Sequence, residues 1–274
     1  SLDNQKSWIK EYMRAYTNAK LHNTYTPEIE KCLMDRNANS LKFNTWYQDF
    51  KTTKTELLNR KDIEVFYWID GLGIPYIQYL LAQKQGIYLN EIIISKSLLP
   101  TITSINKTQL EALTSNLVKI GDIDELAHRK RQYPQYLLED IDVITNAINK
   151  IVSDYAGKKI AIVSDHGLTA LSQFKDGMNL SGIKQHHGGR YAERTSGNAV
   201  SDANYFILDD KKTICALNHK SLGSKISIGS SAHGGCTPEE VLVPIFIISL
   251  SKNFSAELQN ILMNPITMSL FKMK

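Results

Sequence analysis

The chain has 274 residues, 42% hydrophobic and 22% charged, so it can bury one large core or one core with an appendage. Its net charge of +4 is too small to demand a nucleic-acid partner, and it has neither an apolar run near the roughly eighteen residues of a membrane span nor an export signal at its start. Three widely spaced cysteines, Cys32, Cys215 and Cys236, argue against a disulfide framework and favour a reducing, cytoplasmic location.

Residues 1–60 differ from the rest of the chain in the spacing of their apolar residues. Apolar side chains recur there at helical spacings, which predicts two or three amphipathic helices, one of them starting at Thr26-Pro27-Glu28. From Glu64 onward the pattern predicts strands at 65–69, 91–95, 160–163 and 241–248 and helices at 75–85 and 136–155. Such apolar strands alternating with helices indicate an α/β fold with a mostly parallel central sheet and helices on both faces. We expect a helical N-terminal region, 1–60, followed by one domain, 61–274.

Metal-ligating side chains directly follow two of these strands. Asp70 comes after five apolar residues and precedes a Gly turn, and Asp165-His166-Gly167 repeats the arrangement after 160–163. Sites in open α/β sheets form at the carboxyl ends of strands. One such Asp is commonly a helix cap, but two carboxylates and an imidazole at neighbouring strand ends would repel and lose hydration unless a cation held them. The pattern therefore predicts a metal site.

Two further stretches supply ligands of the same kinds. Asp124 and His128 are four residues apart, which places both on one face of a helical turn, although a surface helix pair has the same spacing. His233 lies in a Gly-rich loop before the last strand, where a lone His is usually an ordinary loop residue. With the strand-end groups these make six oxygen and nitrogen ligands, too many for one tetrahedral zinc and suitable for two metals.

A candidate nucleophile lies in Pro100-Thr101-Ile102-Thr103, ahead of a helix expected from about Thr108. Backbone N–H groups at the start of that helix would be placed to meet a phosphate oxygen. The alternative interpretation is a Pro-led helix cap with Thr as the capping residue.

Taken in order, Pro100-Thr101-Ile102-Thr103-x-x-Asn106, Asp124-x-x-x-His128, Ser164-Asp165-His166-Gly167 and His233-Gly234-Gly235, after a strand-end Asp70, resemble the alkaline phosphatase superfamily. The pattern is similar to that of the nucleotide pyrophosphatase/phosphodiesterases. Residues 185–192 and 233–240, with Val243-Pro244, look like the PglZ domain of bacterial BREX phage-defence systems. The resemblance covers residues 62–250 and implies an alkaline-phosphatase-like fold.

The resemblance implies a role for each matching residue. Two divalent metals, expected to be zinc, would be held by Asp70, Thr103, Asp165 and His166 on one side and by Asp124, His128 and His233 on the other. Thr103 is preferred to Thr101 as the nucleophile because it stands three residues before Asn106, which would donate to a phosphate oxygen. Asp122 competes with Asp124 as a ligand, and the Asp-x-x-x-His spacing favours Asp124.

Substrate binding is assigned to His187 and Arg190. Arg190 is placed to clamp a phosphate with two hydrogen bonds, with His187 beside it, although residues 184–197 also fit a mobile surface loop. The basic run Arg129-Lys130-Arg131 adjoins His128, and Lys107 and Lys184 lie in other proposed site loops. These charges favour a nucleotide or nucleic acid such as DNA, while a solvated charge run is the simpler explanation.

The resemblance implies phosphodiester hydrolysis through Thr103 in bacterial phage defence, with other BREX proteins as partners. One alternative is a scaffold or regulatory module of a BREX complex that keeps its metals and docks through aromatic residues of the N-terminal helices. Another is a monoester phosphatase or a sulfatase relative, and the sulfatase nucleophile signature, Cys/Ser-x-Pro-x-Arg, is absent around Thr103.

Overall fold

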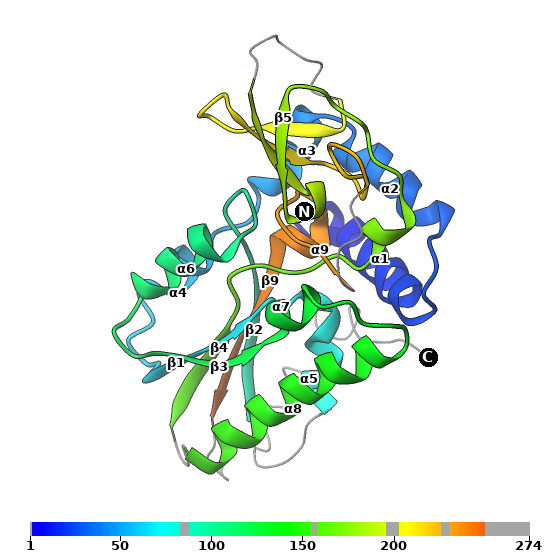
Figure 1. Cartoon of the computed structure of the whole chain (residues 1–274). Helices are drawn as coiled ribbons and strands as arrows, with labels where there is room; N and C mark the ends of the chain where they lie inside the picture. Colours follow the sequence, from blue (N-terminus) through cyan, green and yellow to red (C-terminus); the bar gives the residue numbers. More distant parts are fainter. Residues whose placement is uncertain (1, 83–87, 155–157, 196–202, 226–230, 250–274) are drawn as a thin grey trace.

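Two sheets with surrounding helices form the protein, and the computed structural model describes them over residues 2–82, 88–154, 158–195, 203–225 and 231–249 (Figure 1). The larger sheet has the strand order β2-β9-β4-β1-β3, and the smaller has the order β5-β6-β8-β7. The strands are β1 (Val65–Asp70), β2 (Tyr88–Lys96), β3 (Leu117–Asp122), β4 (Lys159–Val163), β5 (Ile183–His186), β6 (Tyr191–Arg194), β7 (Tyr205–Ile207), β8 (Thr213–Ala216) and β9 (Leu242–Ser249).

Helices precede and connect these strands. Residues 2–60 form α1 (Leu2–Leu21), α2 (Pro27–Asn37), α3 (Ser40–Tyr47) and α4 (Thr53–Leu57). Later helical segments are η1 (Ile74–Tyr76), α5 (Ile77–Ala82), α6 (Thr103–Glu111), α7 (Ile123–Ala127), α8 (Gln135–Asp154), η2 (Leu171–Phe174), η3 (His187–Gly189) and α9 (Pro238–Val241).

The five-stranded sheet is mixed, so the expectation of a mostly parallel sheet is met only around β1. Strand β1 is parallel to β3 and β4, whereas β9 is antiparallel to both β4 and β2. Because β9 runs against its neighbours, its first residue lies at the edge where β1, β2 and β4 end. The loops that follow these three strands and the segment that precedes β9 therefore meet at one edge of the sheet.

The alternation of side chains along β1 explains how both faces of the sheet are covered. Tyr67 and Ile69 pack into a core shared with α5 and α8, while Phe66 and Trp68 face a second core with residues of α4 and α6. Figure 1 shows these two helix pairs on opposite sides of the sheet. Successive residues of a strand point to opposite faces, so a continuous apolar run indicates a strand buried on both.

The N-terminal helices belong to the core of the molecule. Thr26 is the N-cap of α2, as the sequence predicts, but there are four helices in residues 2–60 rather than two or three. Trp8, Tyr12, Tyr16 and Trp46 are buried in the same hydrophobic cluster as strands β1, β4 and β9. The interpretation of these aromatics as an exposed docking surface is therefore wrong, because their rings are buried inside the molecule.

Several predicted elements are confirmed, and some of the structure was not anticipated. The strands over 65–69, 91–95, 160–163 and 241–248 are present with ends shifted by a few residues, as are the helices of 75–85 and 136–155 up to Ala82 and Asp154. Residues 83–87, 155 and 250–274 lie outside the described residues. Strand β3 and the four-stranded sheet were not predicted. Residues 184–186 and 191–194 belong to strands of that sheet, joined by the short helical turn η3, rather than to a loop.

Two expectations from composition are also met within the described residues. No helix there is both long enough and sufficiently apolar to cross a bilayer. Cys32, Cys215 and Cys236 are all free thiols, as their spacing indicates.

Candidate metal centre

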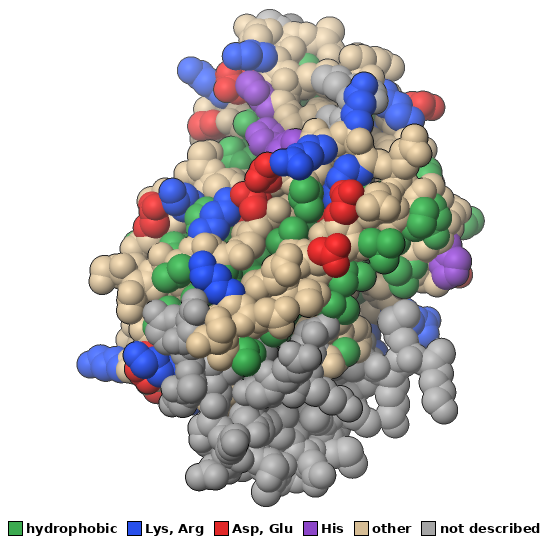
Figure 2. Space-filling view, turned by 60° about the horizontal axis from the view of Figure 1, so that its bottom comes forward, with side chains coloured by type: hydrophobic (Ala, Val, Ile, Leu, Met, Phe, Trp, Pro, Cys, Tyr) green, Lys and Arg blue, Asp and Glu red, His purple; other side chains and the backbone are tan. Residues whose placement is uncertain are grey.

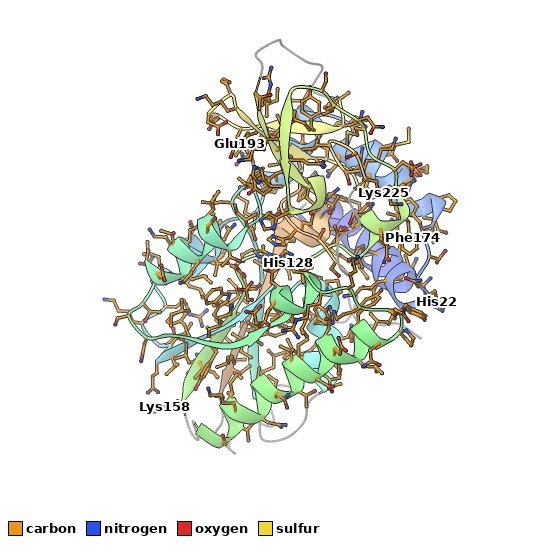
Figure 3. The ribbon with its side chains drawn as sticks, viewed as in Figure 1. His22, His128, Lys158, Phe174, Glu193 and Lys225 are labelled. Carbon is orange, nitrogen blue, oxygen red and sulfur yellow. The ribbon has the colours of Figure 1, made fainter. Side chains whose placement is uncertain are left out.

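The predicted ligands converge at the edge of the larger sheet where β1 and β4 end. Asp70 is the last residue of β1, Asp165 and His166 follow β4, and His233 precedes α9 and β9. Figure 3 places His128 in the middle of the molecule, between the larger sheet and the smaller one above it in that view. Residues far apart in the sequence thus meet where the two sheets face each other.

Four residues whose side chains carry donor atoms form what we name the Asp70 group: Asp70, Thr103, Asp165 and His166. His166 Nε2 lies 3.1 Å from Thr103 Oγ1, 3.4 Å from Asp165 Oδ2 and 3.7 Å from Asp70 Oδ1. Thr103 Oγ1 is 3.5 Å from Asp70 Oδ1. Asp70, Asp165 and His166 are buried, so their donor atoms face one another away from bulk water.

Neighbouring groups fix the orientation of each donor. Asp70 Oδ2 accepts a bond from Lys119 Nζ at 2.7 Å, and Asp165 Oδ1 accepts one from Trp68 Nε1 at 3.2 Å. His166 Nδ1 lies 3.1 Å from the Gly167 carbonyl oxygen, which leaves Nε2 as the basic nitrogen. Asp165 Oδ2 is buried without a hydrogen-bond partner among the described residues. A fixed carboxylate with one unpaired oxygen is the arrangement expected of a metal ligand.

A second set, which we name the Asp124 group, consists of Asp124, His128 and His233. Asp124 Oδ1 lies 3.1 Å from His233 Nε2, Asp124 Oδ2 lies 3.3 Å from His128 Nε2, and the two imidazole nitrogens are 3.4 Å apart. His233 Nδ1 is 2.8 Å from the Thr101 carbonyl oxygen, so its Nε2 is directed at the group. Asp124 Oδ1 makes no hydrogen bond to the described residues despite this proximity.

The structure resolves the sequence alternatives at two positions. Asp122 is the N-cap of α7, since its side chain accepts from Glu125 N at 2.7 Å, while Asp124 faces the histidines. Thr101 is fully buried and donates to the Gly235 carbonyl oxygen at 3.0 Å, whereas Thr103 reaches the ligands. Helix α6 begins at Thr103 rather than near Thr108, which places Thr103 at the helix N-terminus.

The spacing within both groups fits zinc. Two ligand atoms about 2.0–2.2 Å from a tetrahedral zinc are about 3.3–3.6 Å from each other. The distances within the two groups run from 3.1 to 3.7 Å. Carboxylate, hydroxyl and imidazole donors suit a borderline divalent cation.

The two groups adjoin each other. The rings of His166 and His233 stack in parallel with centroids 4.1 Å apart, and Asp124 offers a ligand atom within 4.8 Å of both. The side chain of His128 is 48% exposed, so the Asp124 group opens toward solvent. On the face drawn in Figure 2, histidine side chains lie beside acidic and basic ones. The arrangement can hold two neighbouring cations next to a surface opening.

The carboxylates of the two groups have opposite electrostatic settings. Burial, together with the charge of Asp165, raises the pKa of Asp70 to about 7. Burial also opposes ionisation of Asp124, but His128 and His233 outweigh it and hold the pKa of that carboxyl well below its usual range. The bond to Asp124 raises the pKa of His128. Without a cation, the Asp70 group is therefore short of positive charge.

Asn106 does not have the role predicted for it. Its side chain is buried, and its Nδ2 donates to the carbonyl oxygens of Leu98 and Ile102 at 3.0 and 3.1 Å. Its Oδ1 accepts from Leu98 N at 2.7 Å. The amide thus holds the loop that carries Thr103 and is not directed at a phosphate position.

Arg190 is also placed differently from the prediction. It is fully buried, and its Nε and Nη2 donate to the two carboxylate oxygens of Glu240 at 2.9 and 2.7 Å. Its Nη1 donates to the Lys220 carbonyl oxygen at 3.0 Å. Arg190 therefore ties the smaller sheet to α9 and is not a phosphate clamp. Neighbouring His187 does reach the site, with Nδ1 2.9 Å from His233 Nε2.

The basic run after His128 is largely neutralised by acidic neighbours. Arg129 pairs with Glu125, and the buried Arg131 side chain pairs with Glu139 and Asp140. A cation that the sequence analysis missed is Lys119, which lies between Asp70 and Asp122. Lys119 lies on β3, a strand that was not predicted from the sequence, so its place beside Asp70 was not predicted either.

Searches with protein-family models and among curated proteins find no match to this chain. The chemistry of the site must accordingly be inferred from its own donors and their geometry.

Proposed function

We propose that the protein is a metal-dependent phosphoesterase that uses Thr103 as its nucleophile and two divalent cations, expected to be zinc. The observation that carries this proposal is the position of Thr103 Oγ1, 3.1 Å from His166 Nε2 and 3.5 Å from Asp70 Oδ1, at the first residue of α6. A hydroxyl at a helix N-terminus and among metal-ligating atoms is suited to attack a phosphate ester, because the N–H groups and the helix dipole favour the substrate anion.

Different residues of the site would bind the cations and carry out the attack on phosphorus. Asp70, Asp165 and His166 would hold one cation and Asp124, His128 and His233 the other; when bound, such cations lower the pKa of a coordinated hydroxyl and neutralise phosphate charge. Thr103 Oγ1 loses its proton and forms a bond to phosphorus, while the bond from phosphorus to one ester oxygen breaks and that oxygen is protonated. Water then attacks phosphorus and the bond from phosphorus to Thr103 Oγ1 breaks, which returns a proton to Thr103 and releases a phosphomonoester when the substrate is a diester.

A phosphodiester of a nucleotide or nucleic acid is the proposed substrate class. The resemblance to the alkaline phosphatase superfamily and to the PglZ domain supports it, together with a cytoplasmic role in phage defence alongside other BREX proteins. The partly exposed side chains of Lys107 and Lys119 both lie near Trp68, with ammonium groups 5.9 and 4.7 Å from the centroid of its ring. Lys107 pairs with Glu111 and Lys119 pairs with Asp70 and Asp122, and their remaining exposure adds positive charge near the site for an anionic substrate.

Hydrolysis of bis-p-nitrophenyl phosphate by zinc-loaded protein tests the proposal. We expect Thr103→Ala to lower turnover at least about a thousandfold, the scale at which loss of a nucleophile acts. Thr108→Ala is the matched control, since Thr108 lies on the same helix and its exposed hydroxyl donates to the Ser104 carbonyl oxygen at 3.4 Å, away from the metal-ligating groups. Equal turnover in the Thr103 variant would reject the nucleophile. Zinc binding without any hydrolysis by the wild type would instead favour the scaffold.

A further inference from the structure

His187 stands against the Asp124 group but comes from the other sheet. Its Nδ1 lies 2.9 Å from His233 Nε2, and its ring centroid is 4.3 Å from that of His233 and 5.6 Å from that of His128. His187 begins η3, which directly follows β5 of the four-stranded sheet. It is thus a side chain of the smaller sheet among groups fixed on the larger one.

His233 Nε2 has more polar neighbours than it can serve with hydrogen bonds. Three atoms surround it, His187 Nδ1 at 2.9 Å, Asp124 Oδ1 at 3.1 Å and His128 Nε2 at 3.4 Å. Because His233 Nδ1 faces the Thr101 carbonyl oxygen, Nε2 is left with one lone pair, which can serve only one donor. The ligand nitrogens of His128, His187 and His233 all lie within 4.8 Å of one another, so one cation among them would bind all three imidazoles. Asp124 Oδ1, 3.1 Å from His233 Nε2, adjoins the same nitrogen.

The backbone and a buried ion pair place His187 in this position. His187 has φ 46°, and it is followed by Gly188 and Gly189 with φ 66° and 77°, a run that turns the chain sharply after β5. Such left-handed conformations are uncommon for residues with a side chain and persist where surrounding contacts hold them. The next residue is Arg190, whose bonds to Glu240 tie this turn to α9, a few residues beyond His233.

We propose that His187 is the fourth protein ligand of a Zn²⁺ ion held by Asp124, His128 and His233, so that this ion joins the four-stranded sheet to the five-stranded one. The inference rests on the proposed function, since it presupposes that the Asp124 group binds a metal. Three imidazoles and one carboxylate are donors that zinc takes, and zinc can expand to five ligands, which leaves a position for a substrate oxygen. The Asp70 group contains no side chain of the smaller sheet, so metal binding there does not depend on His187.

The test is a titration of the metal-free full chain with Zn²⁺ in the presence of a competing chelator, combined with amide hydrogen exchange. His187→Asn is the preferred variant because Asn tolerates positive φ, and His187→Gln is the second. His186→Asn is the matched control, since the neighbouring His186 ring stacks on Tyr191 at 5.0 Å and is not part of the group. Urea unfolding of each metal-free variant checks that it folds.

We expect the wild type and His186→Asn to bind two ions, and both His187 variants to bind one of the two at least about tenfold more weakly. Zinc should slow exchange over residues 183–194 in the wild type and not in the His187 variants. Unchanged affinity for both ions and unchanged protection in the His187 variants would overturn the inference while the two-ion site stood. A wild type that binds no zinc would overturn the proposed function as well.

Discussion

The Asp70 group and the Asp124 group present similar donors side by side but are assembled differently. Asp70, Asp165 and His166 are buried: Asp70 is the last residue of β1, and the other two follow the adjacent parallel strand β4. The Asp124 group combines the short helix α7, its C-cap His128 and the loop that carries His233. The first group is fixed by the pairing of two central strands, whereas the second requires separate segments to be brought together by tertiary contacts.

The two groups also differ in what holds them without a metal. In the Asp70 group, two carboxylates are close together and the pKa of Asp70 is raised to about 7, by burial and by Asp165. In the Asp124 group, imidazoles lie against one carboxylate and keep its pKa low. We infer that the Asp70 group needs a cation to balance the negative charge of its carboxylates. The geometry of the Asp124 group depends instead on the packing of α7 against the loop that carries His233.

The largest expected effect comes from breaking the link between the sheets with Arg190→Leu. The change leaves the buried Glu240 carboxylate without its charged partner, although Gly235 N and Thr237 still donate to it. We therefore expect the free energy of unfolding to fall by about 3–5 kcal/mol. The Asp124 group should lose its ion while the Asp70 group keeps one. Urea unfolding and zinc content per chain measure the two effects.

The control for this change is Arg194→Leu at the end of β6, where Nη1 donates to the Lys211 carbonyl oxygen at 3.4 Å, on the exposed side of the smaller sheet. It should leave zinc content unaltered. Loss of both ions in the Arg190 variant, with the fold retained, would show that the two groups are not independently built.

The next effect concerns the pH dependence of the metal-free protein. Because the pKa of Asp70 is raised from 3.8 to about 7 on folding, its stabilising contribution is complete below about pH 4 and is lost as the pH rises through 7. This loss amounts to up to about 4 kcal/mol, at 1.36 kcal/mol per pKa unit. Asp70→Asn should remove it, so the variant should gain stability relative to the wild type from pH 4 to 8.

Urea unfolding in a chelator at several pH values measures this difference, with Asp142→Asn, an exposed carboxyl on α8, as control. Saturating zinc should abolish the pH dependence assigned to Asp70, because the cation replaces the proton. Parallel pH profiles for the wild type and Asp70→Asn in the chelator would contradict the charge imbalance proposed for the Asp70 group.

The smallest effect is expected from Gly167→Ala, next to His166. A Cβ at this position would lie 1.9 Å from the Glu239 carbonyl oxygen, so the loop after β4 or the start of α9 must move. Overpacking of this kind costs about 1–3 kcal/mol, measurable by urea unfolding. Gly73→Ala serves as control, since its nearest contact would be Pro75 Cδ at 3.3 Å. An equally stable Gly167 variant would show that this edge of the sheet is less tightly packed than the structure indicates.

The sequence allowed the strand-end residues to be predicted because each carries a local signal. A continuous apolar run followed by Asp and Gly marks the end of a buried strand, and this placed Asp70, Asp165 and His166 together before their contacts were known. The choice of Asp124 over Asp122 also agrees with the structure, in which Asp122 is the helix cap. Asn106 and Arg190 carried no signal of their burial, because polar side chains are buried only when partners distant in sequence satisfy them.

By itself, the sequence determined the α/β class, the central strands and the kinds of donor at their ends, since strand periodicity and turn residues act over a few neighbouring positions. Only the tertiary structure decided that β9 is antiparallel, that residues 183–216 include a second sheet, and that Arg190 pairs with Glu240 while His187 meets His233. These features depend on contacts between residues tens of positions apart, where pairing is selected by the packing of the whole core.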